Sequence, residues 1–98
     1  MFDLIAIDIG NTNTTIAYYK NGEIKRLDNK KTKYVSSKLK LLLAEKIVIS
    51  SVVPVTTAVI LKKYPLAEIL TLQNISDINF PENIGIDRAI NVVTAMKL

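Results

Sequence analysis

The sequence determines its fold close to the N-terminus, where it reads LIAIDI from Leu4 to Ile9 and then GNTN from Gly10 to Asn13. The apolar run with a single carboxylate predicts a buried strand, and the Gly/Asn-rich stretch predicts a tight turn. The next run, TTIAYY from Thr14 to Tyr19, is rich in β-branched and aromatic residues, and Asn21-Gly22 is a strong hairpin signal. With residues 23–27 as a third strand, the chain is predicted to open as an antiparallel meander.

The rest of the chain is predicted to alternate helices and strands. A first helix is expected from about Thr32 to Glu45, with an apolar face of Tyr34, Val35, Leu39, Leu42 and Leu43. The β-branched run from Lys46 to Val53 predicts a central parallel strand, reached by a crossover. Pro54 suits the first turn of a second helix with Val55, Val59, Ile60 and Leu61 as its stripe. A strand at 69–72, a loop at 73–83 and a helix at 85–97 follow.

The predicted element order is therefore βββαβαβα around a mixed central sheet, an α/β fold. Ninety-eight residues form about one domain. The sequence has no Cys and no His, which excludes thiolate nucleophiles, disulfide frameworks, Cys/His zinc sites and imidazole bases. Any acid or base in a catalytic site must be a carboxylate, a Lys or a Tyr.

Positive charge is concentrated in one segment, since nine basic and three acidic residues lie between Lys20 and Lys46. Such a segment can attract nucleic acid or other polyanions. We prefer a second interpretation, the solvated side of a hairpin and a helix, because the Lys residues alternate with Leu, Tyr and Val. Only two arginines, Arg26 and Arg88, are present to make the bidentate hydrogen bonds by which arginine recognises bases. No nucleic-acid partner is expected.

No membrane association is expected either. Glu45, Lys46 and Pro54 interrupt the longest apolar candidate before it reaches the roughly 18 residues of a membrane span. The N-terminus lacks the basic lead of a signal peptide, and Asp3 and Asp8 flank its short apolar run. We therefore expect a cytoplasmic location.

The first candidate site is the turn that follows Asp8. Gly10 allows a close approach of the backbone to a ligand, the turn N–H groups can point at phosphate oxygens, and Asn11 and Thr12 add side-chain donors. Asp8 can hold Mg²⁺ directly or through water, which offsets the charge of those phosphates. The alternative interpretation is an ordinary tight turn with Asp8 as a strand-end residue.

The second candidate site is the run PENIGIDRAIN from Pro81 to Asn91, where a loop is predicted to become the last helix. Gly85 permits a close approach, Asp87 can act as a general base toward a substrate hydroxyl, and Arg88 can pair with an anionic substrate. The alternative interpretation is that Asp87 is a carboxylate at a helix N-terminus and Arg88 a surface cation.

Three motifs in register, IDIGNTN at 7–13, SSVVP at 50–54 and PENIGIDRAIN at 81–91, resemble the N-terminal half of type III pantothenate kinases, a family that includes the Bvg accessory factor homologues. The resemblance implies the ribonuclease H-like, actin-like ATPase fold of the acetate and sugar kinase/Hsp70/actin superfamily. It implies ATP-dependent phosphorylation of pantothenate to 4'-phosphopantothenate, the first step of coenzyme A biosynthesis. The implied cofactors are Mg²⁺ and a monovalent cation, K⁺ or NH₄⁺, and the implied assembly is a homodimer.

The resemblance also assigns roles to individual residues. Asp8 matches the metal-associated carboxylate of the first phosphate motif, with phosphate contacts from Gly10, Asn11 and Thr12. Asp87 matches the catalytic base. The pantothenate-binding residues match Gly85, Asp87 and Arg88, with Arg88 facing the substrate carboxylate. Residues 50–54 match a structural strand and its exit turn.

Two departures from the family accompany these assignments. Ile78 stands where the family usually has a Tyr that lines the pantothenate pocket. The Asp-x-Gly-Thr-Ala motif of the family's second domain, which completes the ATP site, does not occur in the sequence. We therefore expect residues 1–98 to form a single N-terminal kinase domain that is incomplete for activity alone. The alternative function is a non-catalytic phosphate- or nucleotide-binding protein or an accessory-factor-type regulator.

Overall fold

The computed structural model describes residues 1–70, and the elements in this part of the chain occur in the predicted order. They are β1 (Phe2–Ile9), β2 (Asn13–Lys20), β3 (Glu23–Lys31), α1 (Thr32–Lys38), β4 (Ala44–Ser51), α2 (Pro54–Lys63) and β5 (Glu68–Ile69). The described part is thus a mixed α/β structure, as predicted.

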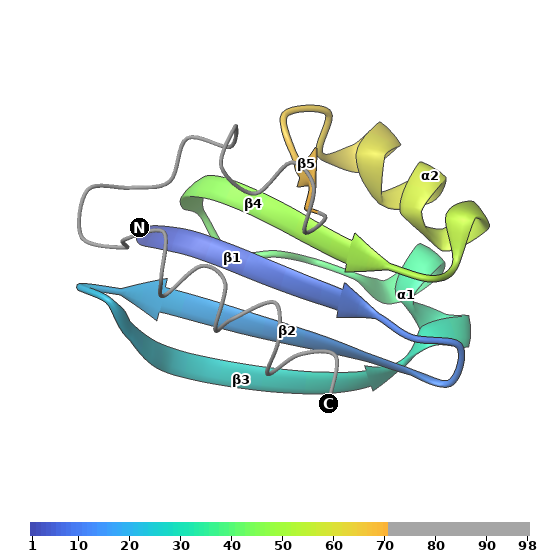
Figure 1. Cartoon of the computed structure of the whole chain (residues 1–98), viewed down its shortest axis with the longest axis horizontal. Coiled ribbons are helices and arrows are strands. Elements are labelled where there is room, and N and C mark those ends of the chain that lie inside the picture. Colours follow the sequence, from blue (N-terminus) through green and yellow to red (C-terminus); the bar gives the residue numbers. More distant parts are fainter. Residues whose placement is uncertain (71–98) are drawn as a thin grey trace.

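One sheet contains the five strands in the order β3-β2-β1-β4-β5 (Figure 1). β1 pairs antiparallel with β2 and parallel with β4, and β5 adds a short parallel pairing to β4. The predicted meander and the predicted crossover to a parallel strand are both confirmed. The β2–β3 hairpin closes through Asn21 and Gly22, whose φ values of 54° and 77° are the positive angles that a tight hairpin turn needs.

The main core lies on the sheet face that α1 and α2 cover. Alternate residues of β1 point to this face, namely Ile5, Ile7 and Ile9, and they form one cluster with side chains from β2, β4 and both helices. Val35 and Leu39 contribute from α1 and its C-terminal end, and Ile60 contributes from α2. The cluster also contains Ile16, Tyr18, Ile49 and Ala67. Burying each isoleucine, leucine or valine side chain of this cluster contributes about 1.5–3 kcal/mol.

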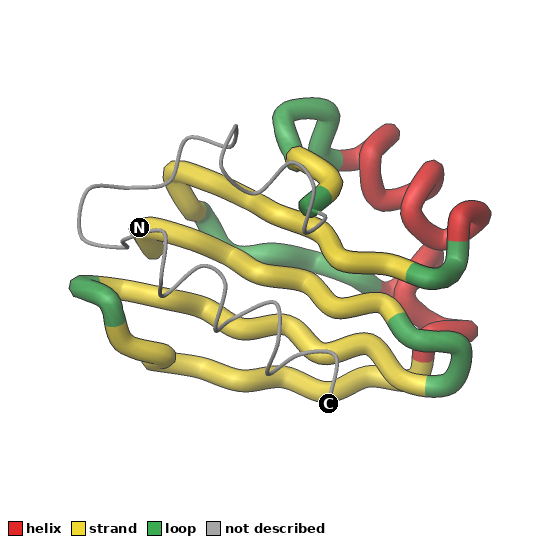
Figure 2. The backbone as a smooth tube through the Cα atoms, in the orientation of Figure 1, coloured by secondary structure: helices red, strands yellow, loops and turns green. Residues whose placement is uncertain are grey.

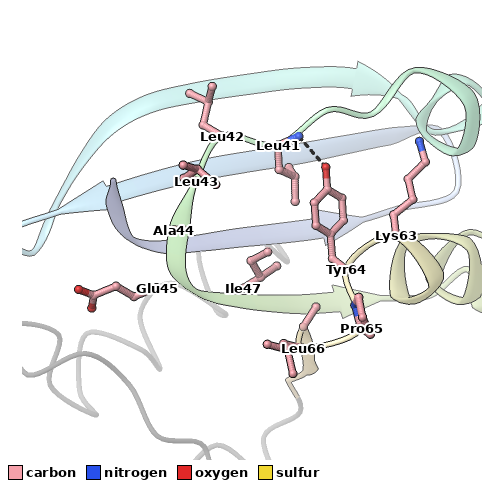
Figure 3. A pocket seen from close by; sticks show the side chains of 11 residues that line it. Leu41, Leu42, Leu43, Ala44, Glu45, Ile47, Lys63, Tyr64, Pro65 and Leu66 are labelled. Carbon is pink, nitrogen blue, oxygen red and sulfur yellow. Dashed lines mark hydrogen bonds between the residues drawn. The ribbon is translucent and has the colours of Figure 1, made fainter.

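The first helix is shorter than predicted, and the expected helix from Thr32 to Glu45 is wrong beyond Lys38. Leu39 has extended backbone angles, and the segment that follows is held in place by tertiary contacts. The Leu41 N–H donates to the Tyr64 hydroxyl at 3.0 Å (Figure 3). The Phe2 N–H donates to the Leu43 carbonyl at 2.8 Å. Pairing with β1 thus overrides the helical periodicity.

The apolar face predicted for this helix is correspondingly wrong in part. Val35 and Leu39 are buried in the core, whereas Tyr34, Leu42 and Leu43 are exposed, Leu43 by 78%. In α2, the buried residues are Thr56, Thr57 and Ile60, and Val55 of the predicted stripe is 76% exposed. Both stripes were predicted from spacing, and the actual face is set by how each short helix meets the sheet.

Several strand boundaries also differ from the predicted ones. β3 continues to Lys31 because it stays paired with β2 as far as Asn13. β4 begins at Ala44 and ends at Ser51, two residues earlier than predicted at either end, in step with its pairing to β1. β5 covers Glu68–Ile69, and the rest of the predicted strand, the loop at 73–83 and the helix at 85–97 lie outside the described residues.

The basic side chains from Lys20 to Lys40 are exposed, as the preferred interpretation requires, whereas Lys46 is partly buried beside Glu68. All residues of β3 are exposed except the half-buried Asp28. Local ion pairs occur along this strand, Lys25 with Glu23 at 2.9 Å and Arg26 with Asp28 at 3.1 Å. Within residues 1–70, neither helix has the length and apolar character that crossing a membrane requires.

Candidate functional site

The turn between β1 and β2 holds the first group of predicted site residues together (Figure 2). Asp8 is the penultimate residue of β1 and is half-buried, and Gly10 follows the strand. Asn11 and Thr12 form the exposed tip of the turn. Four residues that were singled out by sequence therefore occupy one end of one hairpin, with two of them open to solvent.

The turn is anchored to the start of α1 by Thr32. The Thr32 hydroxyl donates to the Gly10 carbonyl at 2.7 Å, and the Thr32 backbone N–H donates to the Thr12 carbonyl at 2.9 Å. A further hydrogen bond of 2.9 Å joins the Thr32 and Thr14 hydroxyls. The turn is thus held from inside the protein while its tip faces outward.

Gly10 lies where the backbone of the turn packs closely. Its N–H donates to the Asn13 carbonyl at 2.9 Å, and a Cβ at position 10 would lie 3.0 Å from that same oxygen. The contact is tighter than ordinary van der Waals packing, and the atom that would have to move is backbone. A side chain at position 10 would therefore require the Asn13 carbonyl to shift by a few tenths of an ångström.

Gly10→Ala is expected to lower the free energy of unfolding by about 1–3 kcal/mol, the usual range for an overpacked site. It should also weaken the binding of inorganic tripolyphosphate, a probe for phosphate binding at this turn, about fivefold, because the turn N–H groups shift. Gly22→Ala is the matched control, since its φ of 77° makes alanine unfavourable at the far end of β2. Denaturant unfolding and calorimetric titration with tripolyphosphate distinguish the two variants, and equal affinities for tripolyphosphate in both would contradict phosphate binding at the Gly10 turn.

Asp8 belongs to a polar row that crosses the sheet on the face opposite the isoleucine core. Its pairing partners are Thr15 on β2 and Ser50 on β4, and Thr15 in turn pairs with Asn29 on β3. Directly paired residues point to the same face of a sheet. The preceding row on this face, through Ala6, contains Leu27, Ala17 and Val48 and is apolar. The face therefore changes from apolar to polar at Asp8, next to the turn.

The charge distribution around the turn favours an anionic ligand. The register places Lys31 directly opposite Asn13 and Lys30 opposite Thr14, and both lysines are exposed. Exposed cations at the edge of a site raise the local concentration of anions. Asp8 supplies one carboxylate at this edge, which is the kind of donor that Mg²⁺ uses together with the oxygens of a bound phosphate chain.

The predicted structural motif at residues 50–54 is confirmed as a strand end and exit turn. The Ser51 hydroxyl accepts from the Val53 N–H at 3.0 Å, and Pro54 begins α2. The Val52 N–H donates to the Ile9 carbonyl at 3.1 Å, which ties this exit turn to the end of β1. The ends of β1 and β4 therefore lie side by side at the edge that holds the candidate turn.

A cavity of about 330 Å³ lies elsewhere, at the beginning of β4 (Figure 3). It is lined mainly by apolar side chains, among them Leu41, Leu43, Ile47, Tyr64 and Leu66. No residue singled out by sequence for function lines it. Within residues 1–70, the structure contains no cluster of three or more acidic side chains that could hold a metal ion without help from a ligand.

The second group of predicted site residues, Gly85, Asp87 and Arg88, lies outside the described residues, as does Ile78. Sequence reasoning did not single out Thr14 or Thr32, and it treated Ser50 as purely structural. A Thr at the first position of a helix was the available signal for Thr32, but its partner in the turn is 22 residues away. Placing Ser50 next to Asp8 required the register between β1 and β4.

A family model described as type III pantothenate kinase matches residues 4–98. The chain belongs to this family. The type III pantothenate kinase match includes all three sequence motifs, at residues 7–13, 50–54 and 81–91. A search of curated proteins found no significant match.

Proposed function

We propose that the chain acts in the transfer of the γ-phosphoryl group of ATP to the hydroxyl of pantothenate, giving 4'-phosphopantothenate and ADP. The observation that carries this proposal is the anchored turn after Asp8, with its exposed tip and neighbouring lysines, inside a pantothenate kinase match that begins at Leu4. A rigid turn rich in backbone N–H groups is a suitable cradle for phosphate oxygens.

In this proposal the turn binds and orients the phosphate chain of ATP. Gly10 permits the close approach, and Asn11 and Thr12 donate side-chain hydrogen bonds from the exposed tip. Phosphoryl transfer depends mainly on positioning and on stabilising charge in the transition state. A turn that Thr32 already holds in place can position the phosphates and stabilise their charge without rearranging during the reaction.

Asp87 is the proposed general base. It takes the proton of the pantothenate hydroxyl as that oxygen forms a bond to the γ-phosphorus, while the bond from the γ-phosphorus to the bridging oxygen breaks and ADP leaves. Arg88 pairs with the pantothenate carboxylate, and Gly85 leaves room for the substrate beside it. These three assignments come from the family motif at residues 81–91.

Asp8 is the residue that would hold Mg²⁺, directly or through water. Its half-buried carboxylate next to the turn fits the usual arrangement in which Mg²⁺ is shared between one or two carboxylates and substrate phosphates. Bound Mg²⁺ neutralises charge on the phosphates. Thr15 and Ser50 flank Asp8 on the same face and offer hydroxyl groups that can orient it.

We also propose that the protein has the wider architecture of the family. Residues 1–98 form one N-terminal domain of the actin-like ATPase superfamily, and a second domain completes the ATP site. A monovalent cation, K⁺ or NH₄⁺, and a homodimer belong to the same proposal. The five-stranded mixed sheet, with a hairpin before the crossover to β4, is compatible with that superfamily.

An acceptor panel tests the proposed substrate. The intact protein is incubated with ATP and Mg²⁺ in the presence of pantothenate, acetate or a set of sugars, and ADP release is measured. We expect release above background with pantothenate alone among these acceptors. Release with a sugar or acetate, and none with pantothenate, would assign a different acceptor to the same kinase fold.

A further inference from the structure

Thr32 donates hydrogen bonds to two carbonyl groups of the candidate turn, those of Gly10 and Thr12. Its hydroxyl donates to the Gly10 carbonyl at 2.7 Å, and its N–H donates to the Thr12 carbonyl at 2.9 Å. A hydroxyl has one proton, and Thr32 gives it to Gly10, so Thr14 must be the donor in the 2.9 Å bond between the two threonine hydroxyls. Thr32 therefore holds two carbonyls and is itself held by Thr14.

These contacts fix the direction of two backbone N–H groups. The peptides of the turn are trans, so the carbonyl and the N–H of each peptide point in opposite directions. Because the Gly10 carbonyl points at Thr32, the N–H of Asn11 points away from it. The Thr12 carbonyl also points at Thr32, which directs the N–H of Asn13 away in the same manner.

We propose that Thr32 is a positioning residue for phosphate binding, which keeps the carbonyl oxygens of Gly10 and Thr12 away from the phosphate chain and leaves the N–H groups of Asn11 and Asn13 pointing away from Thr32. The inference rests on the proposed function, in which this turn binds the phosphates of ATP. A carbonyl oxygen that faced the phosphates would repel them, whereas correctly aimed N–H groups stabilise their charge. Thr32 acts through the turn and does not touch the substrate.

The burial of the threonine pair supports this role. Thr32 is 5% exposed and Thr14 is completely buried, so water cannot readily replace their hydrogen bonds. Losing the hydrogen-bond partner of a buried polar group costs more free energy than losing that of an exposed one. A buried network in which every polar group is hydrogen-bonded favours one conformation. The orientation of the turn is therefore set before a ligand arrives.

The test compares four variants of the intact protein. Thr32→Val removes the hydroxyl with little change of shape, and Thr32→Ser restores it. Thr14→Val removes the donor to Thr32 but leaves the bond from Thr32 to Gly10. Thr57→Val is the matched control, because Thr57 is also a buried threonine, 7% exposed, whose hydroxyl donates to a backbone carbonyl, that of Val53 at 3.1 Å.

Two measurements are made on each variant. Calorimetry gives the affinity for Mg²⁺–ATP and for inorganic tripolyphosphate with Mg²⁺, and steady-state kinetics gives KM for ATP and for pantothenate. Thr32→Val should weaken both ligands about tenfold and raise KM for ATP by the same factor, with KM for pantothenate changed less than about twofold. Thr32→Ser should recover most of the loss, and Thr14→Val should show a smaller loss.

The role of Thr32 is overturned if Thr32→Val and Thr57→Val lose similar stability while both retain wild-type affinity for tripolyphosphate. It is also overturned if Thr32→Ser is as defective as Thr32→Val. A wild-type protein that binds tripolyphosphate but does not phosphorylate pantothenate would remove the proposed acceptor, and the binding affinities of the variants would still decide the role of Thr32.

Discussion

Asp87→Asn is expected to lower the turnover of pantothenate at least about a hundredfold, in line with the usual contribution of a general base. The amide has nearly the shape of the carboxylate but cannot accept the proton of the attacking hydroxyl. Pantothenate binding should change little, because the proposed pair between Arg88 and the substrate carboxylate is kept. The measurement is kcat by ADP release together with the Kd of pantothenate by calorimetry.

Glu82→Gln is the control for this variant, since it neutralises a carboxylate in the same motif to which no chemical role is assigned. It should keep kcat within about twofold of the wild-type value. Near-normal turnover in Asp87→Asn would refute Asp87 as the base. A rise in the Kd of pantothenate with unchanged kcat would instead make Asp87 a binding residue.

Asp8→Asn is expected to raise the Mg²⁺ concentration needed for half-maximal activity by about 10- to 100-fold, the range found when a group that holds or orients a metal is changed. The structural reason is the position of Asp8 in the polar row next to the turn, with Thr15 and Ser50 on either side. Replacing the carboxylate by an amide removes the negative charge and keeps the size.

The matched control is Asp3→Asn, because Asp3 lies at the other end of the same strand and accepts a hydrogen bond from the Asn21 N–H at 2.8 Å. Titration of activity with Mg²⁺ at fixed ATP compares the two variants. Asp3→Asn should keep the wild-type half-saturation. An unchanged Mg²⁺ requirement in Asp8→Asn would count against its assignment as the metal-associated carboxylate.

Local signals in the sequence were sufficient to predict the order and type of the elements from β1 to α2. The Asn21-Gly22 turn, the apolar run before Asp8 and Pro54 at the start of α2 each act within a few residues. The end of α1 was not predictable in the same way. Leu39, Leu42 and Leu43 have helical spacing, but pairing of the following segment with β1, including the bond from Phe2 to Leu43, ends the helix at Lys38.

The same distinction applies to the candidate site. Residues 8–12 were predicted because they are contiguous and their types suit phosphate and metal binding. Thr32 and Ser50 could not be recognised from spacing, because their proximity to this turn depends on the β2–β3 register and on the parallel pairing of β1 with β4. Long-range register, which a single sequence does not reveal, determines which polar groups surround a local motif.

The most direct test of the central claim is transfer of labelled phosphate from γ-labelled ATP to pantothenate by the intact protein. The labelled product is separated and compared with authentic 4'-phosphopantothenate. We predict that label appears in this product only when Mg²⁺ is present, and that it is nearly abolished in Asp87→Asn. Binding of ATP by the wild-type protein without transfer of label to pantothenate would contradict the account and favour a nucleotide-binding or regulatory protein.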